Sequence, residues 1–114
     1  GNYALQKPVQ LAVSMQNNIF VIDGNQIIMF DQYGNGTGKI TGIEEFTSIR
    51  IIFEWLTVAS KDKIFIANLK SPELNLREVF LEGMEDKIEI VSAMIFNNKL
   101  YLLSKKEILI FNRI

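Results

Sequence analysis

The chain contains no cysteine and no histidine among its 114 residues. Without cysteine it cannot form disulfides, iron–sulfur clusters, thiolate nucleophiles or Cys-ligated zinc sites. Without histidine it lacks the commonest general base, so neither Ser-His-Asp nor Cys-His catalysis can be built from this chain alone. Carboxylate, lysine or tyrosine chemistry remains, together with oxygen-ligated Ca²⁺ or Mg²⁺. We assign no catalytic residue, no metal ligand and no cofactor from the sequence.

A strong charge of one sign is also missing, because 12 basic residues stand against 13 acidic ones. This balance gives no general attraction to nucleic acid or to anionic membranes. Lysines gather at residues 61–63, at Lys70 and at residues 105–106, but the aromatic residues fall inside apolar runs and not between these lysines. Platforms on which bases could stack are therefore not expected. No apolar run approaches the roughly 18 residues of a membrane-spanning helix. We expect neither nucleic-acid binding nor membrane insertion.

What the chain does contain is a repeated hairpin pattern. Residues 19–31 (IFVIDGNQIIMFD) match residues 100–112 (LYLLSKKEILIFN) without a gap at an offset of 81. Each copy has four apolar residues, four mostly polar ones and four apolar ones, which is the pattern of two short strands and a turn. A third copy aligns residues 11–14 with residues 56–59, and residues 19–21 with residues 64–66.

These alignments predict units at residues 9–53, 54–89 and 90–114, with residues 1–8 as a leftover outer strand. Periods near 40 made of short strands are typical of propeller blades with four strands each. Residues 19–22 and 108–111 are apolar at every position. Strands with one wet face alternate, whereas the middle strands of stacked blades bury both faces. The sequence therefore predicts an all-β chain of four-stranded antiparallel propeller blades, with a β-sandwich as the alternative.

Residues 5–35 (LQKPVQLAVSMQNNIFVIDGNQIIMFDQYGN) resemble a β-propeller blade of the NHL-repeat type. That family has a loose pattern of a proline before an inner strand, a strand ending in Asp, an Asn-containing turn, a strand ending in Phe-Asp, and a glycine turn. The matching residues here are Pro8, Asp23, Asn25, Phe30, Asp31 and Gly34.

The later copies depart from this pattern. Asn68 and Ser104 stand in the place of Asp23, and Gln26 replaces the arginine that is usual in the turn. The resemblance is thus better evidence for fold than for function. Similar bacterial propellers act outside the cytoplasm, so the resemblance implies an extracytoplasmic protein, periplasmic or secreted.

Three blades are too few to close a ring, since known propellers have roughly four to eight. An open edge of this apolarity promotes aggregation unless something covers it. Two solutions stay open. Two chains can join head to tail as a homodimer with six blades, the number typical of the propellers that the first unit resembles. Alternatively, the remaining blades belong to a longer chain of which these residues are a piece.

Residues 71–83 (SPELNLREVFLEG) allow two interpretations. Ser71, Pro72 and Glu73 would suit the start of a helix, and Gly83 would suit its end. However, residues 79–83 echo residues 29–34 of the first unit. We favour a turn at Ser71-Pro72 followed by a strand from about Asn75 to Leu81.

Two adjacent residues are the candidates for ligand binding. Trp55 and Glu54 stand just before an inner strand, where some propellers present side chains to the central channel. The alternative role of Trp55 is packing between blades. The function that we expect is a binding or scaffolding module that presents blade loops to a protein or small ligand without catalytic activity. The alternatives are part of a propeller hydrolase or lyase with a carboxylate and Ca²⁺ site in the channel, and a structural piece of a larger propeller.

Overall fold

A computed structural model describes residues 1–81 and 88–112. These residues form three antiparallel sheets, and they contain no helix. The first sheet has β1 (Pro8–Val13), β2 (Ile19–Asp23), β3 (Gln26–Phe30) and β4 (Gly36–Thr41). The second has β5 (Ser48–Ile52), β6 (Trp55–Ala59), β7 (Ile64–Asn68) and β8 (Arg77–Glu78). The third has β9 (Ile90–Phe96), β10 (Lys99–Ser104) and β11 (Ile108–Phe111).

In every sheet each strand pairs with its neighbour in the sequence, so each sheet is an up-and-down meander. Short turns make this possible. Gly24 has a φ of 62°, and the two residues Gly24 and Asn25 connect the paired residues Asp23 and Gln26. Glycine adopts this left-handed conformation without the steric cost of a Cβ atom.

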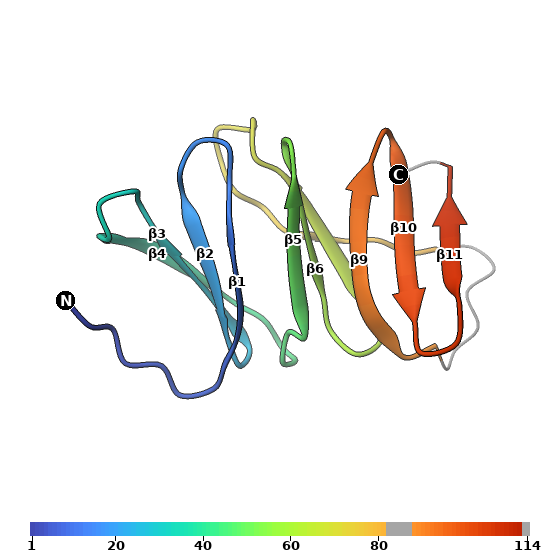
Figure 1. The fold of residues 1–114 in the computed structure, drawn as a ribbon, viewed down its shortest axis with the longest axis horizontal. Coiled ribbons are helices and arrows are strands. Elements are labelled where there is room, and N and C mark those ends of the chain that lie inside the picture. Colours follow the sequence, from blue (N-terminus) through green and yellow to red (C-terminus); the bar gives the residue numbers. More distant parts are fainter. Residues whose placement is uncertain (82–87, 113–114) are drawn as a thin grey trace.

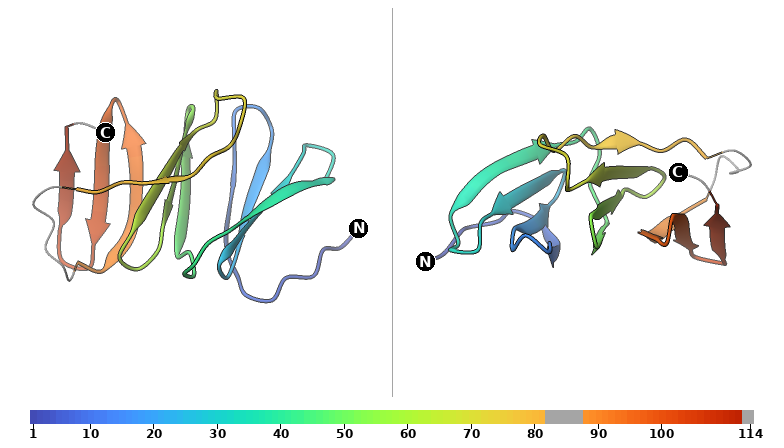
Figure 2. Two further views of the ribbon diagram at one scale, coloured as in Figure 1. Left: turned by 180° about the vertical axis from the view of Figure 1, so that it is seen from behind. Right: turned by 90° about the horizontal axis from the view of Figure 1, so that it is seen from above.

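The three sheets fan out from their first strands (Figure 1). β1, β5 and β9 lie side by side, and the later strands of each sheet extend away from them (Figure 2). The sheets do not close into a barrel. This arrangement is consistent with partial propeller blades, and it confirms the prediction of an all-β fold built from antiparallel sheets. Two of the sheets have the predicted four strands, and the third has three strands among the described residues.

Two apolar layers hold the three sheets together. We call the face of a sheet that turns toward the next sheet in the sequence its leading face, and the opposite face its trailing face. The leading face of the first sheet carries Phe20, Ile22 and Ile27, which pack with Leu56 and Val58 on the trailing face of the second sheet. All five are buried, so this layer is a continuous core.

The same packing repeats between the second and third sheets. Ala59, Ile64 and Ile66 on the leading face of the second sheet pack with Leu100 and Leu102 on the trailing face of the third sheet. The prediction that residues 19–22 and 108–111 are buried on both faces is wrong for the single chain. These runs lie in the first and third sheets, and Ile108 and Ile110 are 57% and 54% exposed. The middle sheet packs against another sheet on both faces, whereas each end sheet does so on one face only.

The repeat units differ from the expected ones in one respect. The sheets begin at residues 8, 48 and 90, whereas the sequence predicted starts near residues 9, 54 and 90. The expected boundary at residues 53–54 falls inside the β5–β6 hairpin. The alignment of residues 11–14 with residues 56–59 paired a first strand with a second strand, because buried strands have similar apolar compositions.

The structure also tests the predictions for the N-terminal residues and for the segment that follows β7. The leftover outer strand predicted at residues 1–8 is not present, because residues 1–7 form no strand and Pro8 begins β1. Residues 69–73 are turns and bends, and β8 covers only Arg77–Glu78, which is shorter than the predicted strand of residues 75–81. No helix forms over residues 71–81. Residues 82–87 lie outside the described residues.

Candidate functional site

The first hairpin of each sheet turns at the same end of the molecule, which we call the tip end (Figure 1, top). These three hairpins are β1–β2, β5–β6 and β9–β10. Each contains at least one residue other than glycine in the left-handed conformation. The residues and their φ angles are Asn17 at 63°, Phe53 at 52°, Asn97 at 52° and Asn98 at 67°. Asparagine tolerates this conformation, but a bulky side chain such as phenylalanine rarely adopts it.

A groove lies between the tips of the β5–β6 and β9–β10 hairpins, and we call it the tip groove. Its volume is about 380 Å³, within the range of small-ligand pockets. Its lining combines five large apolar or aromatic residues with two amides and one carboxylate. The residues are Ile52, Phe53, Glu54, Trp55, Ile95, Phe96, Asn97 and Asn98.

The aromatic residues of the tip groove differ in how firmly they are held. Trp55 is half-buried, starts β6 opposite Ile52, and packs against the core between the second and third sheets. Phe53 and Phe96 are 61% and 46% exposed, respectively. The groove thus has a fixed wall at Trp55 and two aromatic residues open to solvent at its rim.

Glu54 is anchored through its backbone. Its carbonyl oxygen accepts a hydrogen bond of 2.7 Å from the amide of Leu69, in the turn after β7. Its carboxylate lies 3.8 Å from Nζ of Lys70, which is a loose and exposed ion pair. Such a pair restrains the carboxylate weakly. The Glu54 oxygens therefore remain available to a ligand at the edge of the groove.

The structure places both sequence-predicted residues, Trp55 and Glu54, in the tip groove. The opposite wall, formed by Phe96, Asn97 and Asn98, was not among the candidates. This wall comes from the next sheet, and its proximity depends on how the sheets stack. One signal could have indicated it, because the repeated Asn-Asn pair at residues 17–18 and 97–98 marks equivalent hairpin tips.

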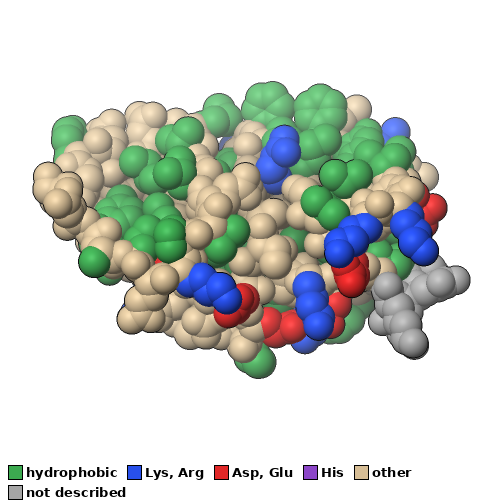
Figure 3. Space-filling model, turned by 60° about the horizontal axis from the view of Figure 1, so that its bottom comes forward, with side chains coloured by type: hydrophobic (Ala, Val, Ile, Leu, Met, Phe, Trp, Pro, Cys, Tyr) green, Lys and Arg blue, Asp and Glu red, His purple; other side chains and the backbone are tan. Residues whose placement is uncertain are grey.

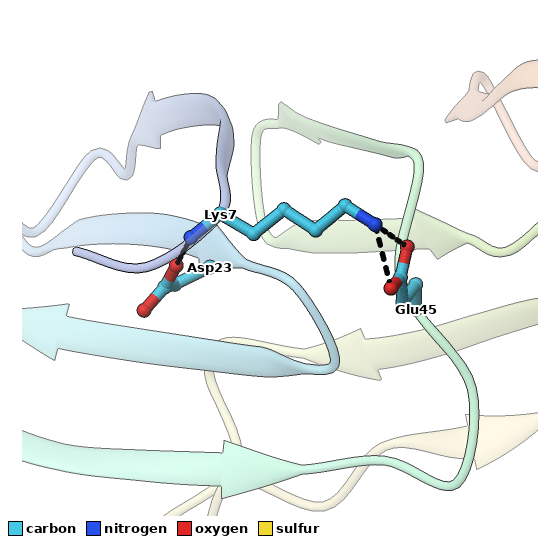
Figure 4. Close-up of polar contacts among 3 residues, drawn as sticks. All are labelled: Lys7, Asp23 and Glu45. Atoms are coloured by element: carbon cyan, nitrogen blue, oxygen red, sulfur yellow. Dashed lines mark hydrogen bonds and ion pairs between the residues drawn. The ribbon is translucent and has the colours of Figure 1, made fainter.

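A larger hollow of about 620 Å³ lies at the opposite end of the sheets. The Asp23 carboxylate accepts hydrogen bonds from the backbone amides of Gln6 and Lys7 there (Figure 4). Nζ of Lys7 donates to both carboxylate oxygens of Glu45 at 2.7 Å. The charged groups in this hollow are therefore already engaged in hydrogen bonds and an ion pair within the chain. They fix the segment before β1 against the β2–β3 turn, and we interpret this hollow as a structural brace.

The end that carries this brace also holds the β2–β3, β6–β7 and β10–β11 turns and the connection from β4 to β5, so we call it the connection end. Charged side chains lie in pairs there (Figure 3). Lys63 contacts Glu44 at 2.8 Å, and Lys105 contacts Glu89 at 2.6 Å. The hydrogen bond that Lys105 donates to Glu89 lowers the pKa of Glu89, and the hydrogen bond that Lys63 donates to the Glu44 carboxylate raises the pKa of Lys63.

Two kinds of feature, a cluster of acidic residues and a long apolar helix, are not found among the described residues. Within residues 1–81 and 88–112, no three acidic side chains come close enough together to hold a metal ion. The same residues include no helix that could cross a membrane.

Comparison with models of known protein families gives no match over this chain, and a search of curated proteins gives no similar sequence.

Proposed function

We propose that the chain is a binding module of the β-propeller type, resembling NHL repeats, that holds an apolar side chain of a protein partner in the tip groove. The single observation that carries this proposal is Phe53. A large aromatic side chain stands 61% exposed at a hairpin tip whose backbone has a φ of 52°. Both the exposure and the conformation are unfavourable for the free protein.

Local strain of this kind is concentrated at binding and catalytic sites. Glycine or asparagine would form the same turn at lower cost, and neither would place an aromatic ring in solvent. Phe53 lines the tip groove together with another exposed aromatic residue, Phe96. Aromatic residues supply much of the binding energy in protein interfaces because they bury a large area with few rotatable bonds.

The polar groups of the groove suit a peptide segment. Asn97 and Asn98 each offer one carbonyl acceptor and one NH₂ donor, and Glu54 adds an acceptor. A few polar groups around an apolar pocket fix the orientation of a ligand. We therefore expect an aliphatic or aromatic side chain to insert between Phe53 and Phe96 while its flanking amides bind the asparagines.

The lining of the groove favours binding over catalysis. A general acid and base pair requires two titratable groups near the ligand, and Glu54 is the one titratable residue in the lining. For this reason we prefer the binding module to the alternative of a propeller hydrolase or lyase.

The proposal is tested by selecting peptides from a random displayed library on the wild-type protein. Trp55 is the single tryptophan, so its emission reports on the groove directly. We expect the selected peptides to contain a large apolar residue and to change this emission on binding. The double variant Phe53→Ser, Phe96→Ser should bind them at least about tenfold more weakly, a loss of about 1.4 kcal/mol.

The matched control is Tyr33→Ser. Tyr33 is an exposed aromatic residue in the β3–β4 turn, outside the groove, so its loss should leave peptide binding unchanged. If the library gives no peptide that distinguishes the wild-type protein from the double variant, the tip groove is not a binding site and the proposal fails.

A further inference from the structure

The two end sheets each leave most of one apolar face uncovered. On the first sheet, the N-terminal segment covers part of this face, where Ile28 is buried and the rings of Tyr3 and Phe30 lie 5.2 Å apart. The trailing face of the first sheet carries Leu11 and Val13, which are 67% and 61% exposed, beside the half-buried Val21 and Phe30. The leading face of the third sheet carries the equivalent uncovered set, which is Tyr101, Leu103, Ile108 and Ile110. Contiguous apolar patches of this kind mark interaction sites.

The sheets themselves indicate what covers these faces. Within the chain, a leading face packs on a trailing face twice, first between sheets one and two and then between sheets two and three. The two uncovered faces are one trailing face and one leading face. If the same stacking continued beyond the chain, the uncovered leading face would pack against a trailing face, and the uncovered trailing face against a leading face. The two uncovered faces are therefore suited to pack against each other.

We infer that two copies of this chain pack head to tail, the leading face of the third sheet of each copy against the trailing face of the first sheet of the other. Each copy contributes three sheets, so two copies give six. Known propellers close with about four to eight blades. One copy has too few sheets for a ring and three copies would have too many, so two is the number that closes.

The exposed area agrees with this assembly. A compact monomeric protein of 13.1 kDa exposes about 6,400 Å² by the usual scaling with mass. This chain exposes 7689 Å², an excess of about 1,300 Å². Specific protein interfaces bury about 1,200–2,000 Å² over both partners. Two copies together have twice this excess area, and the closed ring has two contacts. The excess area available to each contact is therefore about 1,300 Å², which falls within that range.

Closure also completes the tip end. Within one copy the tip groove lies between the second and third sheets. Head-to-tail packing would set the β9–β10 tip of one copy, with Phe96, beside the β1–β2 tip of the other, with Met15 and Asn17. Met15 is itself 69% exposed. The ring would thus have further grooves that neither copy forms alone, although the dimer itself does not depend on groove binding.

The first test is the absolute mass in solution, measured by light scattering during size-exclusion chromatography. We expect a single species of twice 13.1 kDa. Leu11→Glu places a charge in the contact and should convert the protein into a monomer. Ile43→Glu is the matched control, because Ile43 is fully exposed in the β4–β5 connection and belongs to none of the strands that form the two faces, so the change should leave the dimer intact. A monomeric or polydisperse wild-type protein overturns the inference.

The second test identifies which faces meet, and it remains informative even if Leu11→Glu does not fold. The chain has no cysteine, so introduced thiols are the only ones present. Leu11→Cys and Ile110→Cys variants should remain unlinked when oxidised alone, because identical faces do not meet. Their mixture should give a disulfide-linked dimer. Linkage of either variant to itself, or no linkage in the mixture, overturns the head-to-tail arrangement.

Discussion

The connection end and the tip end of the sheets close their hairpins with different residues. At the connection end, Gly24 takes the left-handed position of the β2–β3 turn. The hydroxyls of Ser60 and Ser104 accept backbone hydrogen bonds from Lys63 and Glu107 in the β6–β7 and β10–β11 turns. At the tip end, Gly34 takes the left-handed position of the β3–β4 turn, but the left-handed positions of the three first hairpins hold asparagines and Phe53. The first hairpins of the sheets thus close with more backbone strain than the turns of the connection end.

The charged residues divide between the ends in the same sense. Three ion pairs with distances of 2.6–2.8 Å connect neighbouring segments at the connection end. The tip groove has one loose pair of 3.8 Å, between Glu54 and Lys70. We conclude that side chains at the connection end mainly hold neighbouring segments together, whereas the tip groove has exposed apolar side chains and a carboxylate that is only loosely paired. This is the distribution expected if ligands bind at the tips.

The largest expected effect comes from the core that supports both ends. Leu56 is fully buried between the first and second sheets. Leu56→Ala would leave a cavity there and should lower the free energy of unfolding by about 2–5 kcal/mol, measured by urea denaturation. Both ends should unfold in the same transition. If the tip end alone unfolded at lower urea, the two ends would be independent folding units, which would contradict the comparison.

An intermediate effect should separate the two kinds of turn. Phe53→Gly removes the side chain from a left-handed position and should raise the free energy of unfolding by about 1 kcal/mol, while peptide binding becomes weaker. Gly24→Ala introduces a Cβ atom at a residue in the left-handed conformation and should lower the free energy of unfolding by about 1 kcal/mol. The new Cβ would lie 3.7 Å from Cβ of Lys7, an ordinary contact, so the loss reflects the backbone. Opposite signs in thermal unfolding would sharpen the comparison, and equal signs would contradict it.

The smallest effect should come from the exposed ion pairs. Lys105→Met removes the hydrogen bond that lowers the pKa of Glu89, so that pKa should rise toward its ordinary value in an NMR titration. Because the folded-state pKa of Glu89 is depressed, the pair stabilises the protein above the ordinary carboxyl pKa. This contribution disappears as the pH falls through the folded-state pKa.

Lys106→Met is the neighbouring control, since Lys106 is not part of this pair, and it should leave the Glu89 titration nearly unchanged. An unaltered pKa in Lys105→Met would show that the pair does not persist in solution. At neutral pH we expect little change in stability, because exposed pairs are screened by water and salt.

The sequence predicted the strands better than their grouping. The offset of 81 correctly paired β2 with β10 and β3 with β11, because both hairpins have a four-residue polar spacing. The second sheet was harder, since β5 contains Ser48 and Arg50 and does not read as an apolar run. Hydrophobic patterning identifies buried strands one at a time. It does not say which strand begins a sheet.

The candidate site was predictable on one side only. Trp55 and Glu54 were conspicuous because a large aromatic and a charged residue interrupt the pattern at the start of β6. Phe53 and Phe96 resembled ordinary strand ends, and their exposure follows from turn geometry. The meeting of two hairpin tips depends on the stacking of sheets, which local sequence patterns do not encode.

The sequential strand order has a consequence for the history of the protein. β1, β5 and β9 start at residues 8, 48 and 90, and each sheet is made from one continuous segment of the chain. A segment of about forty residues is thus the unit that folds from local contacts, and it is also a unit that gene duplication can copy whole. A duplicated segment would bring its own hairpins and both apolar faces. The number of sheets could therefore grow or shrink by single genetic events while every contact between sheets kept the same form.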